Sequence, residues 1–317
     1  MIGDGDQANR LRNLMLSKQA GSVAEKLDFD PNIDGSTASR VITIASGKGG
    51  VGKSNLVINL AIQFAKSGRR CVVVDADLGN TNAFASIGVA SQYNLSAVLD
   101  GSKEITDILV DGPGGIRFVS GGAGFSKLAN EANRQNLNPV EANRQISLLL
   151  EKIAPLDDIS DIILIDTGAG MSNLVVDFVA ASYEAVIMIT PEAASVTDAY
   201  AVIKRAKEEN ANLQSLKVVV NRAESKSAGD EIFGKLERAC NKFLKVELNN
   251  IGYLPHDPNL IKAVKAKQPV SIMYPDSPIV KNFELLEEYF VNVENSAAID
   301  SGFKVYMQNL IKKFNNI

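Results

Sequence analysis

Residues 46–54 read Ser-Gly-Lys-Gly-Gly-Val-Gly-Lys-Ser, a glycine-rich run that decides which fold and chemistry the chain can have. The run has the spacing G-x-x-x-x-G-K-[ST] of a phosphate-binding loop, completed by Gly47, Gly52, Lys53 and Ser54. Such a loop surrounds nucleotide phosphates with backbone N–H groups, and glycines let the backbone approach because they carry no Cβ. We therefore expect a nucleotide to contact Gly47, Lys48, Gly49, Gly50, Val51, Gly52, Lys53 and Ser54.

The last two residues of the loop and its flanks indicate the chemistry. Lys53 is expected to neutralise the charge of the β- and γ-phosphates, and the Ser54 hydroxyl to hold Mg²⁺. Residues 41–45 form a β-branched run that ends at the loop, and residues 54–66 follow with helical periodicity. The N-terminus of that helix would point at the phosphates, as anion binding requires.

Short apolar runs alternate with helical segments along the rest of the chain, which predicts an α/β fold with a doubly wound, mostly parallel sheet and helices on both faces. The expected strands are residues 41–45, 71–74, 116–119, 162–165, 185–189, 216–220 and 250–253. The expected helices are residues 53–67, 139–153, 172–181, 195–209, 230–243, 259–265 and 278–289.

The composition fits one large domain in a reducing compartment. A chain of 317 residues, 45% of them hydrophobic, can bury one substantial core. Cys71 and Cys240 have no metal-ligand spacing, and no signal peptide precedes them, so we expect a cytoplasmic protein. No run approaches the roughly 18 uninterrupted apolar residues that a membrane-spanning helix needs. The net charge of −4 and the absence of a basic run argue against direct DNA binding.

Another candidate residue is a carboxylate that ends a strand. Residues 161–166 read Asp-Ile-Ile-Leu-Ile-Asp, and the four apolar residues end at Asp166. In a parallel sheet the carboxyl ends of the strands line the ligand crevice. This pattern matches a Walker B strand, whose carboxylate binds Mg²⁺, commonly through water, so Asp166 joins Ser54 as a candidate metal residue.

The loop has an additional lysine that points to a particular class. Residues 48–54 have the form K-G-G-x-G-K-[ST] and resemble the deviant Walker A loop of the MinD/ParA class of ATPases. In that class the additional lysine, here Lys48, reaches across a dimer interface to the partner's phosphates. The resemblance therefore implies an ATP-dependent homodimer with ATP and Mg²⁺ as ligands, and a catalytic role for Lys48 beside Lys53. Alternatively, Lys48 is an exposed cation that attracts phosphate only in general.

Further motifs extend the resemblance over about residues 40–290. Residues 75–79 resemble switch I of the MinD class, which implies that Asp77 positions the attacking water; a turn or helix-capping aspartate is the alternative. Residues 166–170, Asp-Thr-Gly-Ala-Gly, look like switch II. The strand end at Asn221 and Arg222 resembles the base-recognition element, with a simple turn as the alternative for Asn221. Residues 251–257 resemble the loop over the base, whose candidate contacts are Pro255 and Asp257.

The N-terminus suggests one branch of the class. Residues 6–12, Asp-Gln-Ala-Asn-Arg-Leu-Arg, are similar to the D-Q-A-x-x-L-R motif of the FlhG (FleN/YlxH) family of flagellar-number regulators. In that family the motif stimulates an FlhF-type GTPase. The resemblance implies a partner-binding helix with contacts from Asp6, Gln7, Ala8, Leu11 and Arg12. An isolated helix this short is marginally stable, which suits a segment that folds when it docks. A tail that has no partner is the alternative.

The C-terminus carries an apolar stripe with helical spacing. Its side chains are Phe303, Tyr306, Met307, Leu310 and Phe314, with lysines beside them. An interfacial amphipathic helix on an anionic membrane has this pattern, and so does a helix that packs on the core. The expected organisation is a partner-activating helix (1–20), a linker (21–39), an ATPase domain (40–292) and an amphipathic helix (303–317).

Three functional hypotheses compete. The first is an FlhG-like ATPase that dimerises with ATP, binds the inner membrane surface and controls flagellum number or placement. Its partners would be an FlhF-like GTPase and either switch-complex proteins or a flagellar transcription activator. The second is another positioning ATPase of the class, for a division site or cargo partitioning. The third is a metabolic or electron-transfer enzyme that shares the loop; the two cysteines do not fit an iron–sulfur relative.

Overall fold

The computed structural model describes residues 38–77, 83–132, 147–148, 150–292 and 302–314. The predicted partner-binding helix, nearly all of the predicted linker, and the part of switch I after Asp77 lie outside these residues. So does most of the helix expected over residues 139–153.

The described residues form a central sheet of eight strands in the order β3-β4-β2-β5-β1-β6-β7-β8. Neighbouring strands are parallel except for β3 and β4 at one edge. Because β1 pairs with β5 on one side and β6 on the other, the loop that follows β1 lies at the middle of the sheet. The strands are β1 (Arg40–Ala45), β2 (Cys71–Ala76), β3 (Val110–Asp111), β4 (Arg117–Ser120), β5 (Ile162–Thr167), β6 (Glu184–Ile189), β7 (Ser215–Ala223) and β8 (Glu247–Pro255).

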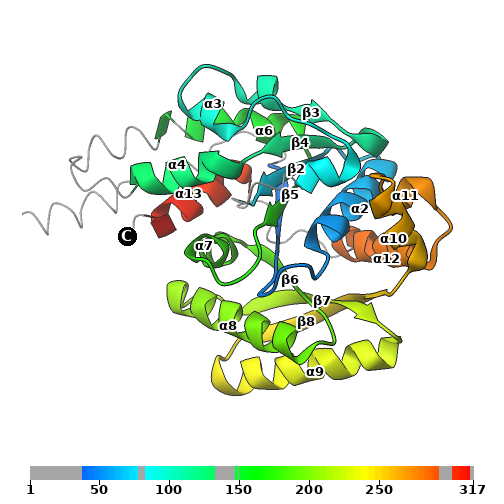
Figure 1. The fold of residues 1–317 in the computed structure, drawn as a ribbon. Coiled ribbons are helices and arrows are strands. Elements are labelled where there is room, and N and C mark those ends of the chain that lie inside the picture. Colours follow the sequence, from blue (N-terminus) through cyan, green and yellow to red (C-terminus); the bar gives the residue numbers. More distant parts are fainter. Residues whose placement is uncertain (1–37, 78–82, 133–146, 149, 293–301, 315–317) are drawn as a thin grey trace, which may run out of the picture.

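Helices cover both faces of this sheet (Figure 1). One core lies between the sheet and α2, α10, α11 and α12, and the opposite face is covered by α4, α7, α8, α9 and α13. The prediction of a doubly wound α/β fold is confirmed. The helices are α2 (Lys53–Lys66), α3 (Leu95–Leu99), α4 (Gly122–Ala132), α6 (Pro155–Ile159), α7 (Asn173–Ala181), α8 (Ala193–Glu209), α9 (Lys226–Phe243), α10 (Pro258–Lys265), α11 (Val270–Met273), α12 (Pro278–Asn292) and α13 (Phe303–Phe314), with short 3₁₀ turns at Ala83–Ile87, Ile105–Ile108 and Pro113–Gly115.

The C-terminal helix α13 belongs to the core, which corrects the expectation of an exposed membrane-binding face. Its apolar side chains pack among α4, α6, α7 and β1, and the ring of Phe178 stacks on that of Tyr306 with centroids 6.5 Å apart. At the centre of the stripe, Met307 and Leu310 are 0% exposed. The buried side chains are Phe303, Tyr306, Met307, Leu310, Ile311 and Phe314. The stripe therefore contacts protein and leaves no apolar face for lipid.

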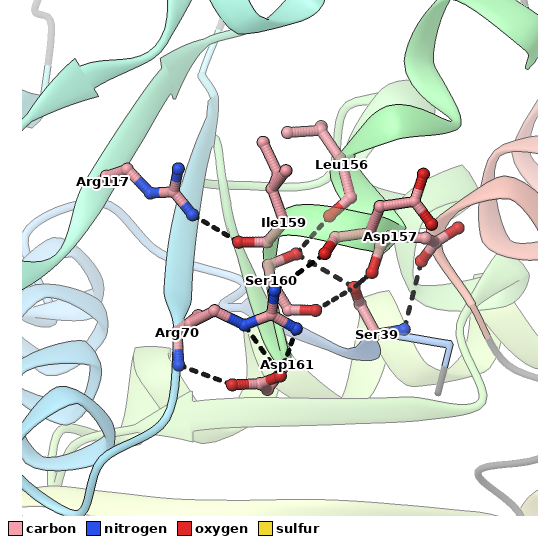
Figure 2. A network of polar contacts seen from close by, with 9 residues as sticks. Ser39, Arg70, Arg117, Leu156, Asp157, Ile159, Ser160 and Asp161 are labelled. Carbon is pink, nitrogen blue, oxygen red and sulfur yellow. Dashed lines mark hydrogen bonds and ion pairs between the residues drawn. The ribbon is translucent and has the colours of Figure 1, made fainter. Parts of the chain in front are cut away.

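A carboxylate on α6 fixes the start of α13. Asp157 accepts hydrogen bonds from the backbone N–H groups of Phe303 (2.8 Å) and Lys304 (3.1 Å), which caps the helix. The same carboxylate accepts from the backbone N–H of Ser39 at 3.2 Å, just before β1 (Figure 2). The Ser39 hydroxyl in turn contacts the Ser160 hydroxyl at 2.9 Å. The start of the first strand and the start of the last helix are thus joined through one side chain.

Among the residues that the structure describes, none of the helices combines the length and the apolar character that crossing a bilayer requires.

Candidate active site

The phosphate-binding loop connects the central strand β1 to α2, as predicted. Gly50 and Gly52 have positive φ angles of 72° and 105°, a conformation that favours glycine. A Cβ on Gly47 would lie 2.2 Å from the carbonyl carbon of Asp198 in α8. A Cβ on Gly52 would lie 2.5 Å from the Nδ2 atom of Asn221. Gly47 is therefore required by its contact with α8, and Gly52 by its contact with Asn221 as well as by its backbone conformation.

Lys53 and Asp166 form the buried centre of the site. Lys53 opens α2 and is 8% exposed, and Asp166 is 2% exposed near the end of β5. Burial lowers the pKa of Lys53, although the negative charges of Asp166 and Asp77 oppose this change. Burial raises the pKa of Asp166 to about 7, although a hydrogen bond with Ser54 and the Lys53 charge act in the opposite direction. These predicted site residues do lie together.

The surroundings of Asp166 fit a magnesium ion. Its Oδ1 atom is buried without a hydrogen-bond partner among the described residues, and its side chain bonds to Ser54. A buried oxygen without a partner is costly, and a hard cation would satisfy it. Within the described part of the chain, no group of three or more His, Cys, Asp or Glu side chains could hold a metal. A Mg²⁺ ion here would rely on Ser54, Asp166, water and phosphate oxygens, as is usual for this ion.

Asp77 lies directly beyond β2 at the same edge of the sheet. Its backbone N–H donates to the Oδ1 atom of Asp75 at 3.0 Å. Its own Oδ1 atom would lie 3.1 Å from a Cβ on Gly168, so Asp77 and the segment predicted as switch II are adjacent. The location agrees with a water-positioning role, and that role stays a prediction.

Lys48 contacts a residue that the sequence analysis missed. Its ammonium group forms an ion pair with Glu192, immediately before α8. The side chains of Lys48 and Glu192 are 40% and 52% exposed, so the pair lies at the rim of the site. The hydrogen bond from Lys48 is the largest cause of a lowered pKa of Glu192, and Arg222 is a second cation 4.0 Å away. The sequence offered one sign of this contact: Glu192 comes just after β6, and β6 lies beside β1 in the sheet.

The predicted base-binding residues lie in two places. Asn221 and Arg222, in β7, contact the phosphate-binding loop itself: Asn221 donates to the Val51 carbonyl at 2.6 Å and Arg222 to the Gly50 carbonyl at 2.8 Å. Asp257 follows β8 and Pro255, and it caps α10 by accepting from the backbone N–H of Asn259 at 2.8 Å.

The carboxylate of Asp257 is also committed to the start of α12. It accepts from the Ser277 hydroxyl at 2.7 Å and from the backbone N–H of Ile279 at 3.2 Å. Burial alone would raise its pKa, but these hydrogen bonds outweigh burial and the pKa is lowered. Asp257 therefore shapes the loop after β8, and its contact with a base stays a prediction.

Comparison with known proteins identifies the family that has this site. The profile of the CobQ/CobB/MinD/ParA nucleotide-binding domain matches residues 42–270, which include the loop, both carboxylates and the base-site candidates. The chain belongs to this family. It is a MinD/ParA-class ATPase, and its curated relatives identify it as FlhG-like.

Two flagellar proteins are among these relatives. The antiactivator FleN of Pseudomonas aeruginosa is 35% identical over 238 residues, which is 75% of this chain and 81% of FleN. The flagellum site-determining protein YlxH of Helicobacter pylori is 27% identical over 97% of this chain and 98% of YlxH. The MinD cell division protein of Aquifex aeolicus has the same fold, with a TM-score of 0.60 and 23% identity over 81% of this chain and 98% of MinD.

In this MinD/ParA ATPase the arrangement can carry out phosphoryl transfer to water. Catalysis of this kind consists mostly of positioning and electrostatic stabilisation. Lys53 provides a buried positive charge beside the loop, and Asp77 lies where it could orient a water molecule. When bound at Ser54 and Asp166, Mg²⁺ would neutralise charge on the phosphate oxygens. In this structure Lys48 forms an ion pair with Glu192 of the same chain, and its contact with the phosphates of a second copy stays a prediction.

Proposed function

We propose that this ATPase is a dimerisation switch that binds ATP with Mg²⁺, dimerises, and returns to the monomer after hydrolysis. The observation that supports the proposal is the position of Lys48. Its side chain lies at the exposed rim of the loop, whereas Lys53 is buried at the centre. A second copy that meets this rim could receive the Lys48 ammonium on its own phosphates. The solved MinD of Pyrococcus horikoshii, described as complexed with Mg-ADP, supports the choice of ligands.

The proposed cellular task is control of flagellum number or placement. Its support comes from FleN at 35% identity and from YlxH, which aligns over almost the full length of both chains. The proposed partners are an FlhF-like GTPase, through residues 6–12, and flagellar proteins of the switch complex or a transcription activator. The name of FleN, an antiactivator, favours the activator among these two.

We place the protein in the cytoplasm, where its buried free cysteines, Cys71 and Cys240, would remain reduced. The proposal does not include a membrane anchor formed by α13, because its apolar face is occupied by the core. Any membrane contact of the ATP-bound form would have to use another surface.

The switch is tested by the mass of the protein with and without ATP, measured by size exclusion with light scattering. Lys53→Ala should lose nucleotide binding. Lys48→Ala should still bind ATP and stay monomeric, because it lacks the cation that crosses the interface. Glu192→Gln is the matched control: it releases Lys48 without removing it, so it should dimerise with ATP. A Lys48→Ala protein that dimerises as the unmodified protein does would contradict the proposal.

The flagellar assignment is tested separately with the FlhF-like GTPase of the same organism. The full chain should accelerate GTP hydrolysis, and a chain that lacks residues 1–20 should not, while both hydrolyse ATP equally. Equal ATP hydrolysis is expected because the phosphate-binding loop, Asp77 and Asp166 all lie after residue 45. If the full chain has no effect on the GTPase under any nucleotide condition, a different positioning role within the family becomes the better hypothesis.

A further inference from the structure

Four carbonyl groups of the phosphate-binding loop accept hydrogen bonds from protein donors. Arg222 donates from Nη2 to the Gly50 carbonyl at 2.8 Å, and Asn221 donates from Nδ2 to the Val51 carbonyl at 2.6 Å. The Ser46 hydroxyl donates to the carbonyl of Lys48 at 2.9 Å. The Gly52 carbonyl accepts the first helical hydrogen bond of α2 at 3.0 Å. Two of these donors, Asn221 and Arg222, come from β7 and lie 170 and 172 residues after the carbonyls that they contact.

The direction of a carbonyl determines the direction of the next N–H group. In a planar trans peptide the C=O bond of one residue and the N–H bond of the next point to opposite sides. The described chain has no cis peptide bond. Holding the Gly50 and Val51 carbonyls against β7 therefore turns the N–H groups of Val51 and Gly52 to the other side of the loop. The positive φ angles of Gly50 and Gly52 allow successive N–H groups to converge, as in an anion-binding nest.

Asn221 is held in place for this contact by a second hydrogen bond. Its Oδ1 atom accepts from the backbone N–H of Arg222 at 2.8 Å, and its side chain is buried, with 5% exposed. Its Nδ2 atom occupies the space that a Cβ on Gly52 would need. Both polar ends of the Asn221 amide are thus used within the protein.

Arg222 holds its position in spite of an unfavourable backbone conformation. Its φ angle is 57°, in the left-handed region that residues other than glycine seldom adopt. The strained turn lets two successive side chains reach two successive carbonyls of the loop. Strain that the surroundings maintain at a ligand site suggests a functional reason for the conformation.

We propose that Asn221 and Arg222 are positioning residues for the phosphate-binding loop. They draw the Gly50 and Val51 carbonyls outward, so that the N–H groups of Val51 and Gly52 face the phosphates before a nucleotide binds. The inference rests on nucleotide binding at this loop, and it assigns Asn221 a role different from reading the base. The contribution of both residues to affinity should depend on the phosphates and be independent of the base.

The test compares the dissociation constants of ADP and of its inosine counterpart, IDP, by titration calorimetry. Asn221→Ala leaves the buried Val51 carbonyl without its donor, and we expect both nucleotides to bind about tenfold more weakly. Asn221→Ser serves as a second variant if the first does not fold. If Asn221 instead recognises the 6-amino group of adenine, which IDP lacks, only ADP loses affinity, and this result would overturn the proposal.

Arg222→Gly separates positioning from a merely structural role. Glycine adopts the observed φ without strain, so the nucleotide-free variant should melt at the same temperature as the unmodified protein or higher. It should still bind ADP and IDP more weakly, because the Gly50 carbonyl has lost its donor. Lys245→Gly is the matched control: Lys245 has a φ of 55° and lies between α9 and β8, away from the loop. This control should gain stability with no change in affinity.

The outcomes also distinguish this inference from the assignment of the family. If the unmodified protein binds neither nucleotide, nucleotide binding at the loop itself fails. If the unmodified protein binds both, and Arg222→Gly binds them equally well, the positioning role is wrong while the ATPase assignment stands.

Discussion

Truncation of Leu310 to alanine measures how much the C-terminal helix contributes to the fold. Leu310 is 0% exposed and packs in the core that α13 shares with α4 and α7. Leu→Ala changes at such sites cost about 2–5 kcal/mol, because the lost transfer free energy adds to the cost of a cavity. We expect about 3 kcal/mol, which lowers the midpoint of urea unfolding by about 1 M if the m-value is about 3 kcal/mol/M. The protein should remain folded, since domains of this kind have about 5–15 kcal/mol of stability.

Lys312→Ala on the same helix is the control, because Lys312 is exposed and its change should stay within about 0.5 kcal/mol. The assay is urea denaturation of the nucleotide-free protein at 25 °C, followed by circular dichroism. If Leu310→Ala and Lys312→Ala unfold at the same urea concentration, α13 does not belong to the core in solution. Deletion of the whole helix is a less informative test. It would remove six buried side chains, on the order of 10 kcal/mol of burial, and the remainder should not fold stably.

Three further predictions concern charge, packing and catalysis. Burial and the nearby charge of Glu209 raise the pKa of the half-buried Asp177 from 3.8 to about 6. The contribution of this carboxyl group to folding stability is therefore complete below about pH 4 and is lost as the pH rises through 6. After allowance for solvent screening, the free energy of unfolding should fall by about 1 kcal/mol between pH 4 and 7. Urea unfolding of Asp177→Asn over the same pH range should not show this fall. Gly47→Ala should lower the melting temperature of the nucleotide-free protein, because its Cβ meets the α8 backbone, whereas Gly49→Ala, whose Cβ has only a 3.7 Å contact, should not. Asp77→Ala should bind ATP and accumulate as dimer in light scattering; unimpaired ATP turnover would contradict its catalytic role.

Much of the fold could be predicted because the central strands are buried on both sides. Such strands read as uninterrupted apolar runs, and seven of the eight strands were predicted close to their observed places. The missed strand β3 has two residues, too few for any pattern to appear. The helices α3, α6 and α11 have four or five residues and were missed for the same reason. The helix α4 has 11 residues and was missed because its first residues, Gly-Ala-Gly, are typical of a turn. The phosphate-binding loop was predicted because its residues are consecutive in the sequence.

The C-terminal stripe shows what periodicity leaves open. An apolar face at helical spacing indicates that something covers it, and lipid and protein both can. What decided between them was a contact that sequence spacing does not reveal: Asp157, about 150 residues earlier, caps the start of α13 and places the stripe over α7. The lysines beside the stripe do not indicate a membrane surface, because one of them, Lys313, donates to the carbonyl of Glu209 on α8.

The sheet topology also explains why Lys48 contacts Glu192. The strength of this ion pair determines whether Lys48 can leave Glu192 for a phosphate group. Strand β6 pairs with β1, so the first residues past β6 face the loop, and Glu192 is one of them. Because both side chains of the pair are about half exposed, solvent screens their attraction and the ion pair contributes little stability. We therefore expect Glu192 to orient Lys48 at the rim without locking it there. In the proposed dimer, a phosphate group bound by a second copy would carry more charge than Glu192 and would lie in a drier interface, so Lys48 should bind the phosphate in preference to Glu192. On this argument Glu192→Gln should leave ATP-driven dimerisation intact or strengthen it slightly, and a strong loss of dimer would show that Glu192 itself belongs to the interface.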